Sequence, residues 1–208
     1  QSHPEWIVKA LRQALVTHGR SGEELEALLA ADNADPEVAL CARPGLIAPE
    51  ALAKAARKAD RVHDVEPRPG RISPLAVVMV GGDPGRIEAI RDCRAGVEDE
   101  GSQLVALVAA HAPVEGRDAR WLDLCAGPGG KAALLAARAA QTGAQLLANE
   151  VSPHRADLVR SALRAIAPDV ARVRCGDGRD LGRDEPGAYD RVLVDAPCTG
   201  LGSLRRRP

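Results

Sequence analysis

The spacing of apolar residues divides the chain into two regions. In the first region the spacing predicts helices and strands in irregular order, at 6–15, 25–29 and 49–59 for helices and at 38–41 and 75–80 for strands. Ser21, with Glu24 three residues later, forms a capping box that marks the start of the second helix. These elements predict a small α+β module over 1–98, in which no motif that carries chemistry stands out.

Beyond residue 98 the predicted elements alternate. Strands are expected at 121–125, 144–150, 171–175 and 189–195, and helices at 103–110, 131–140 and 154–165. Strands that alternate with helices are typical of a doubly wound parallel sheet. We therefore predict an α/β fold with a Rossmann-like domain over 99–208. That sheet is expected to be incomplete at its C-terminal strands, which leaves the 189–195 strand as an edge.

Composition narrows the choice of partners. The chain has 208 residues, a net charge of −1, no Phe, one Tyr and two Trp. Stacking of nucleic-acid bases on an aromatic platform is therefore not expected as the main mode of binding. The candidate basic patch consists of arginines, for which a solvated charged surface is the alternative: Arg172, Arg174, Arg179, Arg183, Arg205, Arg206 and Arg207.

The cysteines give no metal or disulfide pattern. There are five, widely spaced, at Cys41, Cys93, Cys125, Cys175 and Cys198. No apolar run approaches the ~20 residues of a membrane span, and no signal peptide is present. We expect a cytoplasmic protein with reduced thiols, no metal and no membrane contact.

An acid stands at the end of each predicted strand in the second region, at Asp123, Glu150, Asp177 and Asp195. The carboxyl ends of parallel strands meet at one edge, where ligands bind. Four acids there suit a cationic sulfonium nucleoside better than a pyrophosphate. Glu150 is placed to accept hydrogen bonds from ribose hydroxyls, and Asp177 from an exocyclic amine such as that of adenine. For any one of them, capping of a turn or helix is the alternative.

A glycine-rich turn follows the first of these strands. It reads Gly127-Pro128-Gly129-Gly130 and precedes Lys131. Glycine allows backbone N–H groups to approach a ligand closely. The turn lacks the G-x-G-x-x-G spacing of a dinucleotide site, and Lys131 is followed by Ala where a P-loop needs Ser or Thr.

The segment Asp195-Ala196-Pro197-Cys198 places a thiol beside an acid after the last predicted strand. A thiolate that adds to carbon 6 of cytosine makes carbon 5 nucleophilic, and an acid at the ring nitrogen stabilises the developing charge. Methylation of an exocyclic amine is disfavoured, because such sites prefer an Asn/Asp-Pro-Pro-aromatic turn.

Several segments together resemble the Sun/Fmu (RsmB-like) branch of the RNA 5-methylcytosine methyltransferases. They are 2–6, 96–104, 123–131, 149–150 with Arg155, 176–178 and 195–208. The resemblance implies transfer of a methyl group from S-adenosylmethionine to carbon 5 of cytosine, in RNA and specifically in small-subunit ribosomal RNA. It also implies that the 1–98 module binds RNA.

The resemblance assigns roles to individual residues. The cofactor-binding set is Asp123, Cys125, Ala126, Gly127, Pro128, Gly129, Gly130, Lys131, Glu150, Arg155, Asp177 and Asp195. Within it the glycine turn and Glu150 hold the methionine portion and the ribose, and Arg155 orients the acid. Asp177 contacts adenine, and Asp195 hydrogen-bonds the cytosine ring.

Cys198 and Asp195 are the predicted catalytic residues. By resemblance Cys198 helps to release the product, with direct nucleophile and packed thiol as the alternatives. The family's attacking cysteine lies in a later Thr-Cys dipeptide, which these 208 residues lack. We therefore expect a fragment that binds the cofactor without completing turnover, and a non-catalytic S-adenosylmethionine or RNA-binding module is the alternative function. Cys125 and Cys175 are also expected to be buried, small apolar residues of the core.

Overall fold

The computed structural model describes residues 3–33, 37–59, 66–80 and 82–197. The described residues divide into two compact units, one within 3–33 and one within 37–197. Each unit is described by itself. Among the described residues, no helix is long and apolar enough to cross a membrane.

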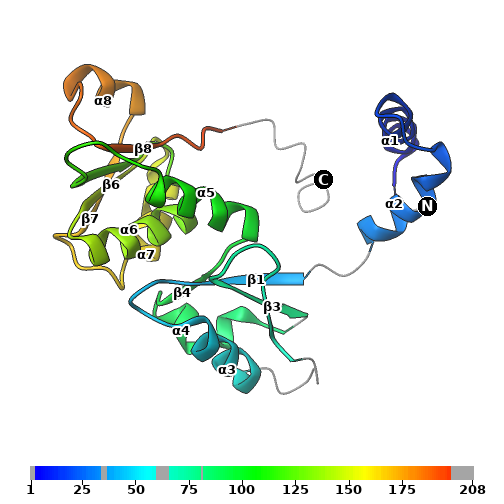
Figure 1. The fold of residues 1–208 in the computed structure, drawn as a ribbon, viewed down its shortest axis with the longest axis horizontal. Helices are drawn as coiled ribbons and strands as arrows, with labels where there is room; N and C mark the ends of the chain where they lie inside the picture. Colours follow the sequence, from blue (N-terminus) through cyan, green and yellow to red (C-terminus); the bar gives the residue numbers. More distant parts are fainter. Residues whose placement is uncertain (1–2, 34–36, 60–65, 81, 198–208) are drawn as a thin grey trace. The chain divides into compact units, whose positions relative to one another are not determined.

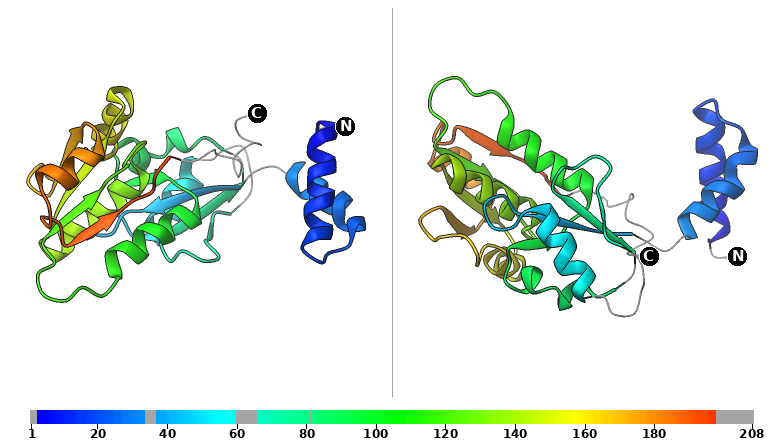
Figure 2. Two further views of the ribbon diagram at one scale, coloured as in Figure 1. Left: turned by 90° about the horizontal axis from the view of Figure 1, so that it is seen from above. Right: turned by 60° about the horizontal axis from the view of Figure 1, so that its bottom comes forward.

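The smaller unit is helical. Helix α1 (Glu5–Thr17) packs against the 3-10 helix η1 (Gly22–Glu24) and against α2 (Leu25–Asn33) (Figure 2). The predicted capping box is confirmed, since the Ser21 hydroxyl accepts the Glu23 N–H and the Glu24 carboxylate accepts the Ser21 N–H. These bonds satisfy N–H groups that a helix start leaves without partners.

The larger unit begins with an antiparallel sheet in the order β2-β3-β1-β4. Its strands are β1 (Glu37–Ala42), β2 (Arg68–Pro69), β3 (Ala76–Val80) and β4 (Ala95–Val97). Three further helices accompany them, α3 (Pro49–Ala59), η2 (Pro84–Arg86) and α4 (Glu88–Arg91) (Figure 1). The fully buried side chains of Leu40, Leu52, Val77 and Ile87 form one core between helices and sheet.

The second sheet is parallel, in the order β7-β6-β5-β8. Its strands are β5 (Arg120–Asp123), β6 (Gln145–Glu150), β7 (Ala171–Cys175) and β8 (Arg191–Leu193). The helices are α5 (Glu100–His111), α6 (Gly130–Thr142), α7 (Pro153–Ala162) and α8 (Gly178–Asp184) (Figure 1). The predicted α/β fold, a partial Rossmann-like sheet preceded by an antiparallel α+β module, is confirmed.

Helix α6 is the centre of this second half. Seven of its residues are buried, five of them alanines. It packs against α5, β5, β6 and α7. Alanine has a high helix propensity and no bulk beyond Cβ, so a helix rich in it can lie close to several neighbours at once. This packing holds the start of α6 firmly against the sheet.

Arg43 joins the two halves of the larger unit. It is 5% exposed, and its Nη1 donates to the carbonyl oxygen of Cys93 and, at 2.7 Å, to that of Ala162 at the end of α7. The predicted division at residue 98 falls between β4 and α5, inside this compact unit. The antiparallel and parallel sheets are therefore linked by buried polar contacts.

Some predicted elements differ in extent from those observed. Strand β8 covers only 191–193 of the expected 189–195, and just before it the Asp190 carboxylate accepts the N–H groups of Ala119 and Arg120. Helix α8 and the short strands β2 and β4 were not predicted. Each has too few buried side chains to leave an apolar period: α8 buries only Leu181.

Candidate functional site

The strand ends of the parallel sheet converge on a pocket of about 460 Å³. Asp123 at the end of β5 pairs with residues of β6 and β8, so these three strands finish close together. Ligand sites of open parallel sheets lie at this edge. The lining residues are Leu124, Cys125, Gly127, Asn149, Glu150, Val151, Arg155, Asp177, Gly178, Arg179, Val194, Asp195, Ala196 and Pro197.

The turn between β5 and α6 requires glycine at two positions. Gly129 has a φ of +113°, and a Cβ there would lie 2.8 Å from the Cβ of Ala162. A Cβ on Gly127 would collide with the carboxylate of Glu150. The turn therefore lies directly on its neighbours. Helix α6 begins at Gly130 with no side-chain cap, so its first N–H groups can bind an anionic group.

Glu150 is buried, and each of its carboxylate oxygens accepts a hydrogen bond. It is 3% exposed, its Oε2 accepts the Gly127 N–H at 3.1 Å, and its Oε1 accepts the Ser152 N–H at 3.0 Å. Arg155 lies 3.5 Å from Oε2 and donates to the Gly127 carbonyl oxygen. Arg155 is thus bound both to the acid and to the turn, in the arrangement that an orienting role requires.

Asp123 is buried without hydrogen-bond partners. It is 1% exposed, and neither carboxylate oxygen has a partner among the described residues. Burial raises the pKa of Asp123 to about 7. The nearby Cys125 N–H and the positive charge of Lys131 lower the pKa, but only partly offset this rise. The Cys125 N–H does not meet the geometry of a hydrogen bond to either oxygen. A buried acid of this kind is stabilised when a cation or a donor binds beside it.

Lys131 and Asp195 form an ion pair at the opening of the site. The Lys131 ammonium lies 2.9 Å from Asp195 Oδ2 and donates to the Ser102 hydroxyl oxygen at 3.1 Å. Asp195 comes two residues after β8, and its side chain is 54% exposed. A ligand at the mouth of the pocket can therefore reach this carboxylate.

Glu98 is a functional candidate that the sequence reasoning missed. It follows β4, and a Cβ on Gly130 would lie 3.2 Å from its Cδ. Its Oε1 is buried without a hydrogen-bond partner among the described residues. Burial raises the pKa of Glu98 to about 7, against the opposing charges of Lys131 and Arg43. The only signal for it was its place in the segment 96–104.

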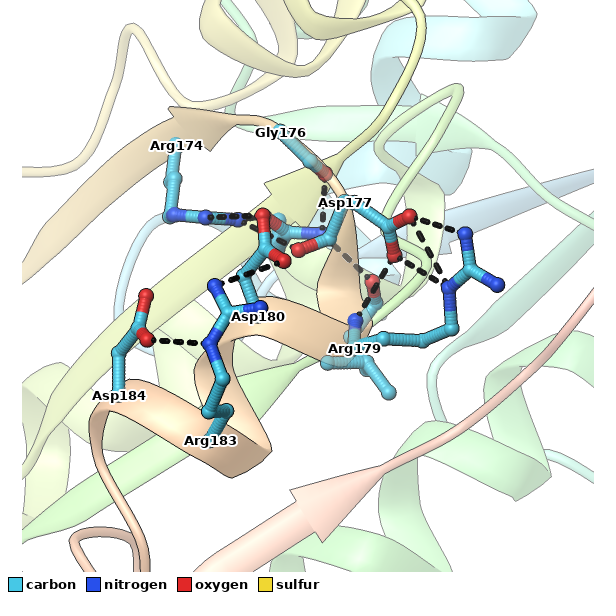
Figure 3. Close-up of polar contacts among 9 residues, drawn as sticks. Arg174, Gly176, Asp177, Arg179, Asp180, Arg183 and Asp184 are labelled. Atoms are coloured by element: carbon cyan, nitrogen blue, oxygen red, sulfur yellow. Dashed lines mark hydrogen bonds and ion pairs between the residues drawn. The ribbon is translucent and has the colours of Figure 1, made fainter.

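Asp177 lies at the pocket but not at a strand end. Strand β7 ends at Cys175, and Asp177 caps helix α8 by accepting the N–H of Arg179 (Figure 3). The Arg179 side chain bonds to the same carboxylate, which lowers the pKa of Asp177 to about 2. The helix-cap alternative raised from the sequence is therefore present alongside the pocket location.

Within the described residues, three of the four arginines of the predicted basic patch are paired with acids, and Arg172 is exposed on β7 without an ion pair. Arg174 forms an ion pair with Asp180, and Arg179 forms one with Asp177 (Figure 3). Arg183 pairs with both Asp180 and Asp184. Positive charge neutralised by adjacent acids contributes little to a field that attracts polyanions. Arg205, Arg206 and Arg207 lie outside the described residues.

The cysteines differ from expectation. Cys175 is exposed, because β7 is an edge strand, and Cys125 is only partly buried and lines the pocket. The prediction that both are core residues is wrong. Burial and the nearby carboxylates raise the pKa of the Cys125 thiol, which disfavours the reactive thiolate. Cys198 lies outside the described residues.

The structure brings most of the predicted cofactor set together. Six of its members line the pocket: Cys125, Gly127, Glu150, Arg155, Asp177 and Asp195. Asp123, Ala126, Gly129, Gly130 and Lys131 lie behind or beside this lining, in β5, the turn and the first turn of α6. Pro128 is exposed in the same turn.

Comparison with known proteins gives consistent matches. Residues 109–208 match the profile of a family described as 16S rRNA methyltransferase RsmB/F. A Mycobacterium tuberculosis protein with a provisional methyltransferase name, Rv1407, is 52% identical over 207 residues, which are 100% of this chain and 42% of that protein. Ribosomal RNA small subunit methyltransferase B of Pseudomonas putida is 32% identical over 210 residues, 100% of this chain and 44% of that protein. The chain therefore spans less than half the length of these relatives.

Solved structures share the fold. The crystal structure of PH0851 superposes with a TM-score of 0.79 at 20% identity, over 99% of this chain and 44% of that one. The structure of NSun6 from Pyrococcus horikoshii with SFG gives a TM-score of 0.50 at 25% identity, over 61% of this chain and 33% of that one.

Proposed function

Because this chain belongs to the RsmB/F (Sun/Fmu) family of RNA 5-methylcytosine methyltransferases, which use S-adenosylmethionine, we propose that its pocket binds that cofactor. We further propose that the protein transfers the methyl group to carbon 5 of a cytosine in RNA. Small-subunit ribosomal RNA is the substrate that the names of its relatives favour.

The unpartnered carboxylate of Asp123 is the observation that carries the cofactor assignment. S-Adenosylmethionine is a sulfonium with an α-ammonium group, and a buried acid without a hydrogen bond favours such a cation. The uncapped start of α6 suits its carboxylate. A pyrophosphate would meet Asp123, Glu150 and Asp195 and be repelled by them.

The remaining cofactor contacts follow from the lining of the pocket. Glu150 keeps lone pairs for the ribose hydroxyls while it holds Gly127 and Ser152. The exocyclic amine of adenine is assigned to Asp177. Gly127 and Gly129 allow the turn to approach the ligand without a Cβ in between.

The reaction centre is assigned to the mouth of the pocket. The bound cofactor supplies an electrophilic methyl group. We assign the hydrogen bond to the cytosine ring to Asp195, which pairs with Lys131. We assign to Cys198 the release of the methylated product, and to a cysteine outside these 208 residues the attack on carbon 6. Residues 1–98 are proposed to contact the RNA.

Binding of the cofactor is tested by titration calorimetry on the 208-residue chain. Asp123→Asn and Glu150→Gln are each expected to weaken S-adenosylmethionine binding at least about tenfold, since each removes a charge that attracts the cation. Asp157→Asn, an exposed acid of α7, serves as the control. Unchanged affinity in both pocket variants would reject the cofactor assignment.

Methyl transfer distinguishes the enzyme from a binding module. We expect the chain to bind the cofactor but to incorporate no tritiated methyl group into unmodified small-subunit ribosomal RNA. Incorporation that is lost in Cys198→Ala would instead make Cys198 the nucleophile. A stable covalent adduct with RNA that contains 5-fluorocytosine would exclude the non-catalytic alternative.

A further inference from the structure

Both oxygens of the Asp177 carboxylate accept hydrogen bonds from Arg179 (Figure 3). Oδ1 accepts the Arg179 backbone N–H at 2.9 Å and its Nε–H at 3.0 Å. Oδ2 accepts from Nε at 3.0 Å and also from Nη2. A carboxylate offers about four lone-pair positions. Arg179 Nε–H is shared between the two oxygens, so three N–H groups face these four positions. In this conformation the amine of adenine must therefore share the carboxylate of Asp177 with the guanidinium of Arg179.

Two arginine side chains donate to Asp177, Arg179 to its carboxylate and Arg174 to its backbone carbonyl oxygen. Only Arg179 is placed to move away. The backbone carbonyl oxygen of Asp177 accepts from Arg174 at 3.0 Å, and Arg174 also donates to Asn149 at 2.6 Å. The Arg179 side chain, in contrast, is 91% exposed. Rotation of Arg179 into solvent would expose no apolar core and would leave the cap of α8 in place, because the cap uses its backbone N–H.

Both Asp177 and Arg179 line the pocket. Arg183 lies on the same helix, is 72% exposed, and pairs with Asp180 and Asp184, but it is not part of the lining. The two arginines thus have similar charge, exposure and pairing, and differ in whether their partner belongs to the proposed adenine subsite. Arg183 is therefore a matched control.

We propose that Arg179 is a specificity-determining residue of the adenine subsite, because its guanidinium competes with the 6-amino group of the purine for the carboxylate of Asp177. This inference rests on the proposed function, in which Asp177 receives adenine. Binding of an adenosyl ligand through Asp177 therefore competes with the Arg179–Asp177 ion pair. Arg179 therefore weakens the binding of every ligand whose base donates a hydrogen bond to Asp177.

The size of the effect is set by the strength of an exposed ion pair. Such pairs are weak in water, so their loss changes an affinity by a small factor. We expect Arg179→Met to bind S-adenosylhomocysteine about 1.5- to fivefold more tightly than the unaltered chain. Methionine retains the length and helix propensity of the arginine side chain without its donors.

The experiment is isothermal titration calorimetry of the full 208-residue chain with two ligands. S-Adenosylhomocysteine carries the 6-amino group, and S-inosylhomocysteine carries a keto oxygen, which cannot donate to Asp177. The proteins are the unaltered chain, Arg179→Met, Arg183→Met, and Arg179→Met combined with Asp177→Asn. Asparagine also caps helices well, so the double variant retains α8.

The expected result is tighter binding of S-adenosylhomocysteine by Arg179→Met alone, with no gain for S-inosylhomocysteine and none in the double variant. Equal or weaker binding by Arg179→Met would overturn the inference, and so would an equal gain for both ligands or in Arg183→Met. Absence of S-adenosylhomocysteine binding by the unaltered chain would instead reject the proposed function.

Discussion

At the scale of residues, the dominant feature is the group of acids around Lys131. Asp123 and Glu98 reach this lysine from β5 and from the end of β4, and the pKa of each is raised to about 7 by burial. Lys131 opposes both shifts and also pairs with Asp195. Both carboxyls therefore titrate near neutral pH, and a bound cation is expected to promote their ionisation.

The stability of the chain is predicted to depend on pH through Asp123. The folded state keeps the proton on Asp123 up to about pH 7, whereas an unfolded chain loses it near its ordinary pKa of about 4. Between these values the folded state binds more protons. The free energy of unfolding therefore falls as pH rises from about 4 to 7 and changes little above that range.

Urea unfolding at pH 5 and pH 8 measures this dependence. Asp123→Asn is expected to reduce the loss of stability between the two pH values by roughly 1–3 kcal/mol. The stability of this variant is still expected to fall as pH rises, because the pKa of Glu98 is also raised. Asp157→Asn, on the exposed side of α7, is the control and should behave like the unaltered chain. An Asp123→Asn variant with the same pH dependence as the control would show that Asp123 ionises normally.

At the scale of elements, the turn before α6 determines how closely the sheet, α6 and α7 approach one another. Gly129 and Gly127 are in contact with α7 and with Glu150, respectively. Gly143 ends the same helix, also with positive φ (+76°), but a Cβ there would meet nothing within 4 Å. At Gly143 only the backbone conformation favours glycine, whereas at Gly129 both the conformation and the lack of space for a Cβ do.

Gly129→Ala is expected to destabilise the chain by about 2–4 kcal/mol, because it combines an unfavourable φ with a clash against Ala162. Gly143→Ala should lose only about 1 kcal/mol, from the backbone conformation alone. Urea denaturation of both variants compares the two losses. Equal losses would indicate that α7 can shift to accept the added methyl group.

At the scale of the whole molecule, the buried Arg43 links the antiparallel sheet to the parallel one. Its guanidinium donates to carbonyl oxygens in the turn before β4 and at the end of α7. Gln103 of α5 adds a second link, since its side chain accepts from the Ser73 hydroxyl and donates to the Glu98 carbonyl oxygen. These contacts explain why β4, Glu98 and the start of α6 lie together within one compact unit.

Arg43→Met is predicted to lower the free energy of unfolding by about 2–4 kcal/mol, because it leaves two buried carbonyl oxygens without donors. Arg94→Met, which removes an arginine paired with acids near the surface, should change it by less than about 1 kcal/mol. Chemical denaturation followed by tryptophan fluorescence reports the larger unit through Trp121. A loss no larger than that of Arg94→Met would show that the hydrogen bonds of Arg43 contribute little to joining the two sheets.

Much of the fold was predictable because its elements are locally determined. The strands β1, β3, β5, β6 and β7 and the long helices have enough apolar residues in period to be recognised without tertiary contacts. The capping box at Ser21 is likewise a local signal. The short elements α8, β2 and β4 were missed because hydrogen bonds and long-range pairing, rather than an apolar period, define them.

The sequence by itself determined the parallel sheet, the glycine turn and the acids near its strand ends, because alternating strands and helices form a parallel sheet whose carboxyl ends share one edge. The tertiary structure decided the state of each acid. Asp123 is buried without a partner, Glu150 is buried with three, and Asp177 is bound by an arginine two residues away. It also brought Glu98 to Lys131 from another sheet. The ionisation of an acid depends on its burial and on neighbours distant in sequence, and only the folded chain sets these.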